Sequence, residues 1–140
     1  MMRYIFILLF LFSCASDKSL HQSNLEILDE VILKHDELMI EMKTLKDLKM
    51  KIESLEVSDT SIDKAVNNLD DARKHMMSFM KGFSEEFPYD KYPMQRDSFE
   101  GIDDKELKQI NNKLQKKKEV VMQVSFKFSS SIDQAKKLLD

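Results

Sequence analysis

Residues 55–66 read LEVSDTSIDKAV, and this stretch decides the fold. Apolar residues recur at helical spacing on both sides of it, and the polar run Ser58-Asp59-Thr60 breaks that pattern. Side chains of these types accept hydrogen bonds from the free backbone N–H groups at a helix start, so Thr60 and Asp63 are placed to begin a second helix. A connection this short joins antiparallel neighbours. The sequence therefore predicts a helical hairpin that turns near residues 58–59.

The helix before this turn is predicted over residues 24–56. Ser23 and Glu26 have the spacing of a capping box, in which each side chain satisfies a backbone N–H of the other residue. At 1.5 Å per residue such a helix is roughly 50 Å long. Its apolar residues lie on one stripe, as expected of a helix with one buried face. The stripe consists of Leu28, Val31, Ile32, Leu38, Met39, Met42, Leu45, Leu48, Ile52 and Leu55.

The rest of the chain predicts two more helices with a loop between them. The second helix covers residues 60–86. Residues 87–102 contain both prolines and one of the two glycines of the chain, and are therefore predicted to be a loop. Asp103 and Glu106 have the capping-box spacing again, and a near-heptad apolar stripe follows, so the third helix is predicted over residues 103–139.

The predicted fold is all-α, an up-down-up antiparallel three-helix bundle that occupies residues 23–140. Hydrophobic residues make up 42% of the chain and charged residues 34%, which is typical of a globular domain. The third helix is longer than the second, which leaves a face for a possible homodimer. The net charge is −3 and both signs are mixed along the chain, so no basic face for nucleic acid is expected.

The first 13 residues predict a targeting segment. Arg3 supplies a positive charge, and an unbroken apolar run of nine residues follows from Tyr4 to Phe12. A bilayer crossing needs about 20 apolar residues, so this run is too short for one. Its length and flanks fit the hydrophobic region of a secretory signal peptide. Residues 1–13 are therefore expected to be removed on export.

Leu11-Phe12-Ser13-Cys14 resembles the lipoprotein box of bacterial lipoproteins, with a leucine three residues before the only cysteine. Phe12 departs from the small residue that is commoner at its position. The resemblance implies that Cys14 is diacylated and becomes the new N-terminus, with residues 14–22 as a lipidated tether. Because Ala15 is not the Asp associated with inner-membrane retention, it implies an outer-membrane location facing the periplasm. The alternatives are an ordinary signal peptide with an incidental cysteine, or a short uncleaved anchor.

A candidate metal site lies in the predicted hairpin. If residues pair across the turn when their numbers add to about 117, His35 lies near the level of Met80. Met39 and Met42 then lie near the level of Met76. Imidazole and thioether groups suit Cu(I), so these five residues are a candidate copper site. The alternative is that the histidine is a hydrogen-bonded core residue and the methionines fill gaps in the core.

Two segments resemble those of small, uncharacterised helical lipoproteins of Bacteroidota-type bacteria. One begins at His35 with the pattern His-Asp-Glu-x-Met-x-x-Met, and the other is Ala72-Arg-Lys-His-Met-Met-Ser-Phe-Met80. The second has Phe79 where tryptophan is usual. The resemblance covers roughly residues 25–85 and implies no known activity. The expected function is a non-enzymatic binding or structural role in the cell envelope, through an unknown envelope protein. The alternative is periplasmic copper binding.

The loop over residues 87–102 is expected at the membrane-proximal end of the bundle, because the first helix begins near the lipid and the second returns to that end. It carries four aromatic residues, Phe87, Tyr89, Tyr92 and Phe99. Aromatic rings beside cationic side chains suit the headgroup zone of a bilayer. Alternatively, the rings plug the open end of the bundle.

Overall fold

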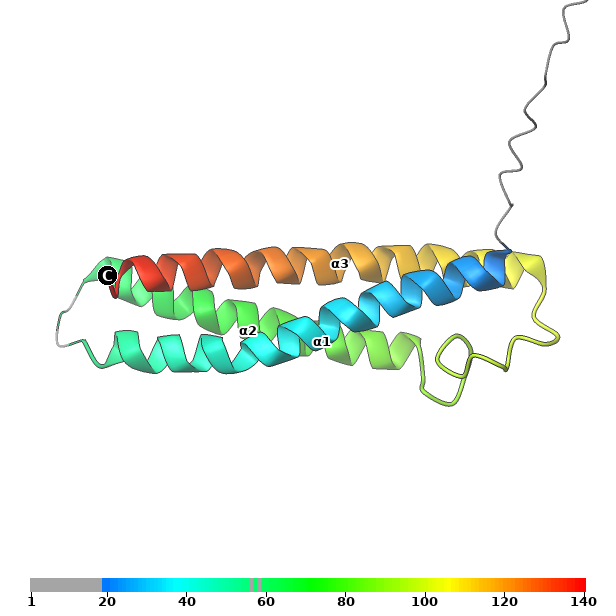
Figure 1. Ribbon diagram of the computed structural model, residues 1–140, viewed down its shortest axis with the longest axis horizontal. Helices are drawn as coiled ribbons and strands as arrows, with labels where there is room; N and C mark the ends of the chain where they lie inside the picture. The colour runs from blue at the N-terminus through cyan, green and yellow to red at the C-terminus, as the bar shows by residue number, and fades with distance from the viewer. Residues whose placement is uncertain (1–18, 56, 58) are drawn as a thin grey trace, which may run out of the picture.

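The computed structural model describes residues 19–55, 57 and 59–140, and it contains three helices. They are α1 (Leu20–Glu53), α2 (Thr60–Glu86) and α3 (Asp104–Lys137). Helices α1 and α3 begin at the same end of an elongated bundle, and α2 runs in the opposite direction (Figure 1). The predicted all-α, up-down-up three-helix bundle is confirmed. Cys14 and the targeting segment lie outside the described residues.

The predicted start of α1 is wrong by one helical turn. The N-cap is Ser19, whose hydroxyl accepts a hydrogen bond from the backbone N–H of Gln22 (3.2 Å). Ser23, predicted to be the cap, lies inside the helix, and its hydroxyl accepts a hydrogen bond from Asn111 on α3 (3.1 Å). The predicted tether is therefore too long, since residues 20–22 belong to α1. The helix also ends at Glu53 rather than at residue 56.

The bounds of α2 agree with the prediction, and those of α3 agree within two residues. Asp59 caps α2 by accepting a hydrogen bond from the N–H of Ser61 (3.0 Å). Asp103 caps α3 by accepting one from the N–H of Glu106 (2.8 Å), as half of the predicted capping box requires. The last helical residue of α3 is Lys137, two residues before the predicted end.

One apolar core runs through the bundle and is built from all three helices. Among the described residues, its side chains and those packed against it lie between Leu25 and Leu139. Full burial of a large aliphatic or aromatic side chain stabilises the folded state by about 1.5–3 kcal/mol. The largest completely buried apolar side chains are Phe128, Leu28, Leu45, Ile52, Leu69, Met76, Leu114, Val31 and Val121.

Helix α1 crosses from α3 toward α2 along its length. Near its start, the fully buried Asn24 donates a hydrogen bond to the Leu107 carbonyl of α3 (3.1 Å) and accepts one from Asn111 (2.9 Å). Near its end, Lys49 donates to Asp70 of α2 (2.6 Å), and this bond raises the pKa of Lys49. The numbers of this pair add to 119, close to the predicted sum of about 117.

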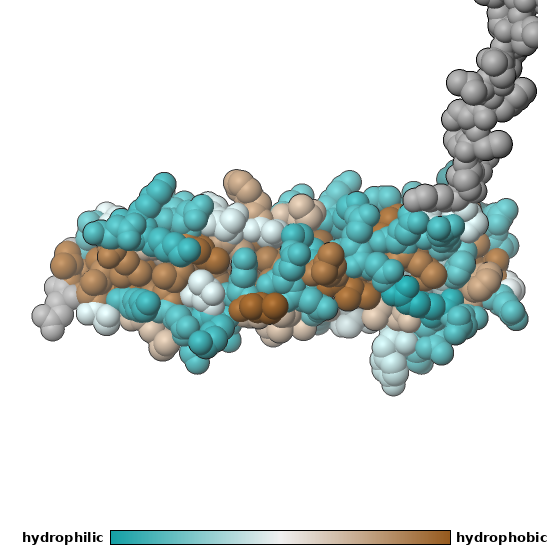
Figure 2. All heavy atoms as spheres, viewed as in Figure 1, coloured by the Kyte–Doolittle hydropathy of each residue, from teal (hydrophilic) through white to brown (hydrophobic). Residues whose placement is uncertain are grey.

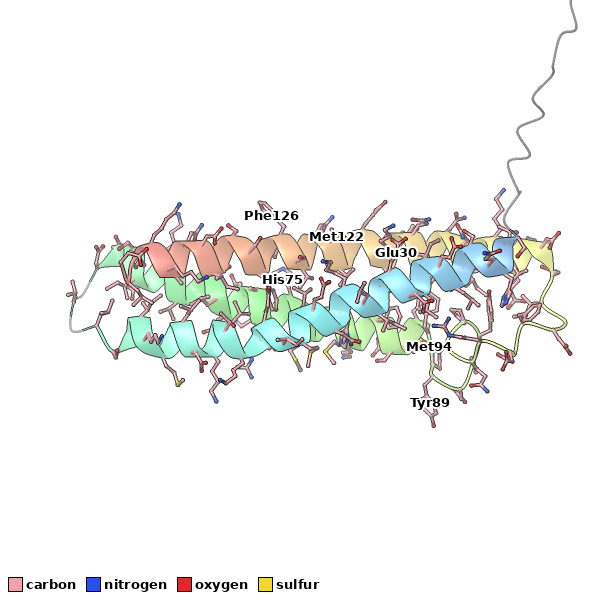
Figure 3. The ribbon with its side chains drawn as sticks, viewed as in Figure 1. Glu30, His75, Tyr89, Met94, Met122 and Phe126 are labelled. Atoms are coloured by element: carbon pink, nitrogen blue, oxygen red, sulfur yellow. The ribbon has the colours of Figure 1, made fainter. Side chains whose placement is uncertain are left out.

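The connection between α2 and α3 lies at the end where α1 begins, and it packs mainly as a plug. Phe87 and Tyr92 are buried, and burial raises the pKa of the Tyr92 hydroxyl. Phe99 stacks on His21 of α1 with ring centroids 3.9 Å apart. Only Tyr89, with 83% of its surface exposed, points away from the bundle (Figure 3). Among the described residues, no helix combines the length and apolar character needed to cross a membrane.

Candidate functional site

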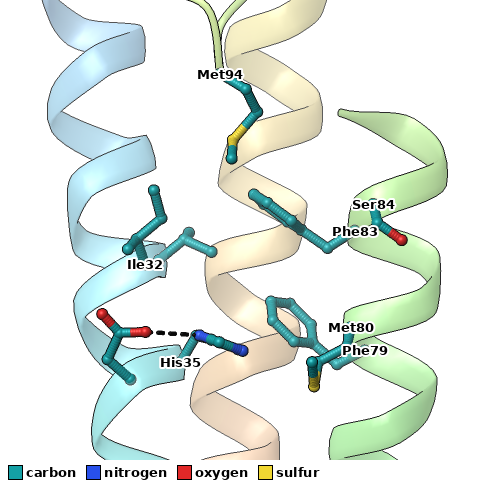
Figure 4. A pocket seen from close by; sticks show the side chains of 9 residues that line it. Ile32, His35, Phe79, Met80, Phe83, Ser84 and Met94 are labelled. Atoms are coloured by element: carbon teal, nitrogen blue, oxygen red, sulfur yellow. Dashed lines mark hydrogen bonds and ion pairs between the residues drawn. The ribbon is translucent and has the colours of Figure 1, made fainter. Parts of the chain in front are cut away.

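An apolar cavity of about 310 Å³ lies where α1 and α2 part beside the loop. Figure 4 shows it from close by, with α1 on one side, α2 on the other and Met94 of the loop at one end. Three of its lining residues are polar, namely His35, Asp36 and Ser84. The apolar lining consists of Val31, Ile32, Phe79, Met80, Phe83 and Met94.

The path of α1 explains why this space exists. The first part of α1 is held against α3 by Asn24 and by the ion pair of Glu30 with Lys118. The last part is held against α2 by the ion pair of Lys49 with Asp70. Between these attachments, at residues 31–36, α1 is still moving away from α3 and toward α2. The side chains there leave a gap, and the loop covers one end of it.

His35 lies at the rim of the cavity rather than in the core. Its side chain is 28% exposed, and Nδ1 donates a hydrogen bond to the carboxylate of Asp36 (2.9 Å). An ionised carboxylate only accepts, so Nδ1 carries a proton, and whenever the ring is neutral Nε2 presents a lone pair. Figure 4 shows this second nitrogen turned toward α2. The ring thus offers the cavity one hydrogen-bond acceptor.

The five residues of the predicted copper site are only partly brought together. His35 and Met80 line the cavity. Met39 is 41% exposed, Met42 packs against the core from a half-buried position, and Met76 is completely buried, and none of the three lines the cavity. Within the described part of the chain, no three or more His, Cys, Asp or Glu residues form a group that could hold a metal ion.

Met94 lines the cavity and was missed by the sequence analysis. It comes from the loop, where no helical periodicity indicates which side chains face inward. In Figure 4 it lies at the end of the cavity away from His35. Phe83 and Ser84 of α2 also line the cavity, and Figure 4 shows them at the level of Ile32, whereas Met80 lies at the level of His35. The cavity is therefore more aromatic and less sulfur-rich than predicted.

Lysine side chains in the middle of α3 contact both other helices. Lys117 donates to the carbonyl of Gly82 (3.0 Å) and lies 3.0 Å from the carboxylate of Glu86, and Lys118 pairs with Glu30. The face in Figure 2 is largely hydrophilic, and its hydrophobic groups gather along the line between α3 and α1 toward the chain end. Lys117 and Lys118 of α3 therefore serve contacts between helices.

No protein-family model matches the chain, and neither a curated protein nor a solved structure matches it. The cavity and the N-terminal sequence pattern therefore carry the functional proposal.

Proposed function

We propose that this chain is a lipid-anchored protein of the bacterial cell envelope, with a non-enzymatic role in binding an apolar ligand in the cavity between α1 and α2. The cavity is the observation that carries the binding role. Small-molecule sites are concave, mostly apolar and equipped with a few polar groups, and a volume of about 310 Å³ lies at the lower end of their range. The aromatic and thioether lining favours apolar ligands.

The anchor is proposed from the N-terminal sequence alone. The apolar run before Cys14 is too short to span a bilayer, and Cys14 is the only cysteine. Two or three acyl chains give stable attachment where a single chain is marginal. Five residue steps from Cys14 to Ser19 reach at most about 18 Å. Under this proposal the end of the bundle where α1 begins stays close to the membrane, on the periplasmic side of the outer membrane.

A single substitution tests the anchor. We expect Cys14→Ser to release the protein from membranes while its helicity and thermal unfolding stay unchanged, because the core lies between Leu25 and Leu139. The measurement is the distribution between membrane and soluble fractions after a salt wash, beside the wild-type chain. If the Cys14→Ser protein remains in the membrane fraction, the anchor assignment is wrong.

Methionine methyl groups report directly on the cavity. We expect naphthalene, added to methyl-¹³C-methionine-labelled Cys14→Ser protein (residues 14–140), to shift the NMR signals of Met80 and Met94. The exposed Met50 and Met122 lie outside the cavity and serve as internal controls. If all four signals respond alike or none responds, the cavity is not a binding site.

A cavity-filling variant provides the second arm of this experiment. Ile32→Phe places extra volume in the cavity and should abolish the shifts. Leu33→Phe adds the same ring at the neighbouring, 62% exposed position and should leave them unchanged. Circular dichroism of both variants checks that the helices are retained. Equal binding by the two variants would place the ligand elsewhere.

Copper binding is the second candidate function, and the pair of His35 with Asp36 favours it. A metal-binding imidazole commonly donates its other N–H to a carboxylate, as His35 does. Met80 and Met94 supply thioethers in the same cavity, and Met39, Met42 and Met76 belong to the original candidate set. Anaerobic Cu(I) titration of the same labelled protein tests this. Shifts of the methionine methyl signals that saturate at one equivalent of Cu(I) would support copper binding. If the signals shift with naphthalene but not with Cu(I), copper binding at this cavity is excluded.

A further inference from the structure

The cavity is partly open to solvent, so its volume indicates the size of the part of a ligand that it can enclose. A water molecule occupies about 30 Å³ of the liquid, so about 310 Å³ corresponds to roughly ten non-hydrogen atoms. An apolar cavity of about 150 Å³ in another protein accepts benzene. The cavity here has about twice that volume, which fits two fused rings better than a long acyl chain.

The polar groups at the cavity determine which functional group the ligand carries. Nδ1 of His35 is bonded to Asp36, which leaves Nε2 as an acceptor. Ser84 donates its hydroxyl proton to the carbonyl of Lys81 (3.0 Å), and Figure 4 shows its oxygen turned away from the cavity. No lysine or arginine lines the cavity, and the carboxylate of Asp36 disfavours an anion. Nε2 of His35 is therefore the polar atom that faces the cavity, and as an acceptor it is complementary to a neutral group that donates.

From these observations we infer that the ligand is a neutral bicyclic or similarly compact apolar molecule with one hydroxyl group, which donates its proton to Nε2 of His35. This inference rests on the proposed binding function and adds the chemical class of the ligand. A ketone, ether or carboxylate of the same size would place lone pairs against the lone pair of Nε2. Figure 4 shows the ring of His35 positioned between α1 and α2 for this contact.

Two probes that differ in their donor test the inference. 2-Naphthol donates a hydrogen bond, and 2-methoxynaphthalene has the same rings and oxygen without the donor. Their dissociation constants are measured at pH 8, where an imidazole is neutral, with Cys14→Ser protein and its His35→Leu and His75→Leu derivatives. We expect the preference for 2-naphthol over 2-methoxynaphthalene to fall about three- to tenfold in His35→Leu, which corresponds to one net hydrogen bond.

The comparison between proteins cancels the different hydration of the two probes. His75 is exposed and does not line the cavity, so His75→Leu should keep the wild-type preference. If both probes bind but His35→Leu leaves their ratio unchanged, the hydroxyl inference is wrong and the apolar binding function stands. If neither probe shifts Met80 and Met94 in any of the proteins, the proposed binding function itself fails.

Discussion

Replacing Asn24 by Leu should destabilise the bundle more than its position near a helix start suggests. Asn24 is completely buried between α1 and α3. Its side chain donates to the Leu107 carbonyl (3.1 Å) and accepts from the amide of Asn111 (2.9 Å). Leucine has a similar size but makes neither hydrogen bond. The amide of Asn111 would keep only its contact with the hydroxyl of Ser23 (3.1 Å).

The expected cost follows from these contacts. Each lost hydrogen bond contributes about 1 kcal/mol net, and a buried partner left short of bonds costs about 1–3 kcal/mol. The apolar surface of leucine returns about 1 kcal/mol. Asn24→Leu should therefore lower the free energy of unfolding by about 2–4 kcal/mol. For a domain of this size that corresponds to a fall in Tm of roughly 10 °C.

Far-UV circular dichroism during thermal and urea unfolding of the Cys14→Ser protein measures this change. The informative partner is Asn24→Leu combined with Asn111→Leu, because removing both groups leaves no underpaired amide. We expect the double variant to be more stable than the sum of the two single effects predicts, by at least 1 kcal/mol. A neutral Asn24→Leu, or effects that add within about 0.5 kcal/mol, would refute the proposed coupling.

Three further predictions concern local features of the bundle. Gly82→Ala should raise the free energy of unfolding by up to about 1 kcal/mol in urea titrations, because alanine favours a helix interior and its Cβ would lie 3.5 Å from Lys117 Nζ, an ordinary contact. The cap hydrogen bond from Ser61 lowers the pKa of Asp59 from 3.8. The ionised carboxylate therefore stabilises the fold above pH 3.8, and this stabilisation is lost as the pH falls through the lower pKa of the folded state. Asp59→Asn keeps a cap and should weaken this acid dependence of Tm. Arg96→Lys breaks the bidentate contact with Asp29 and should lower the free energy of unfolding by less than about 1 kcal/mol. It should nevertheless speed amide hydrogen exchange in the loop after α2.

The helices were predictable because apolar periodicity and capping residues act locally. The bounds of α2 were read correctly from a polar break and a single stripe. The start of α1 was not, because Ser19 and Gln22 have the same capping spacing as Ser23 and Glu26. Both serine hydroxyls accept a hydrogen bond. The donor to Ser19 is a backbone N–H of α1, whereas the donor to Ser23 is the side chain of Asn111, which only the position of α3 brings close.

The candidate site was less predictable because it depends on how the helices cross. A turn sequence indicates only the approximate register of the hairpin, and it does not indicate that Phe83 and Met94 line the same cavity as His35. The crossing of α1 from α3 to α2 has no signature in a hydrophobic stripe. It follows from contacts such as Asn24 with Asn111, which join residues 87 positions apart.

That separation also orders the assembly of the bundle in time. The contacts between α1 and α3 close a segment of 83–88 residues, whereas α1 and α2 meet across a short turn. Closing a longer segment costs more chain entropy, and contacts between distant residues form more slowly. The hairpin is therefore expected to form first, and Asn24 lacks its hydrogen-bond partners until the last quarter of the chain packs against it. During translation or export this intermediate displays the apolar stripe that α3 later covers, and it is the species most prone to aggregate.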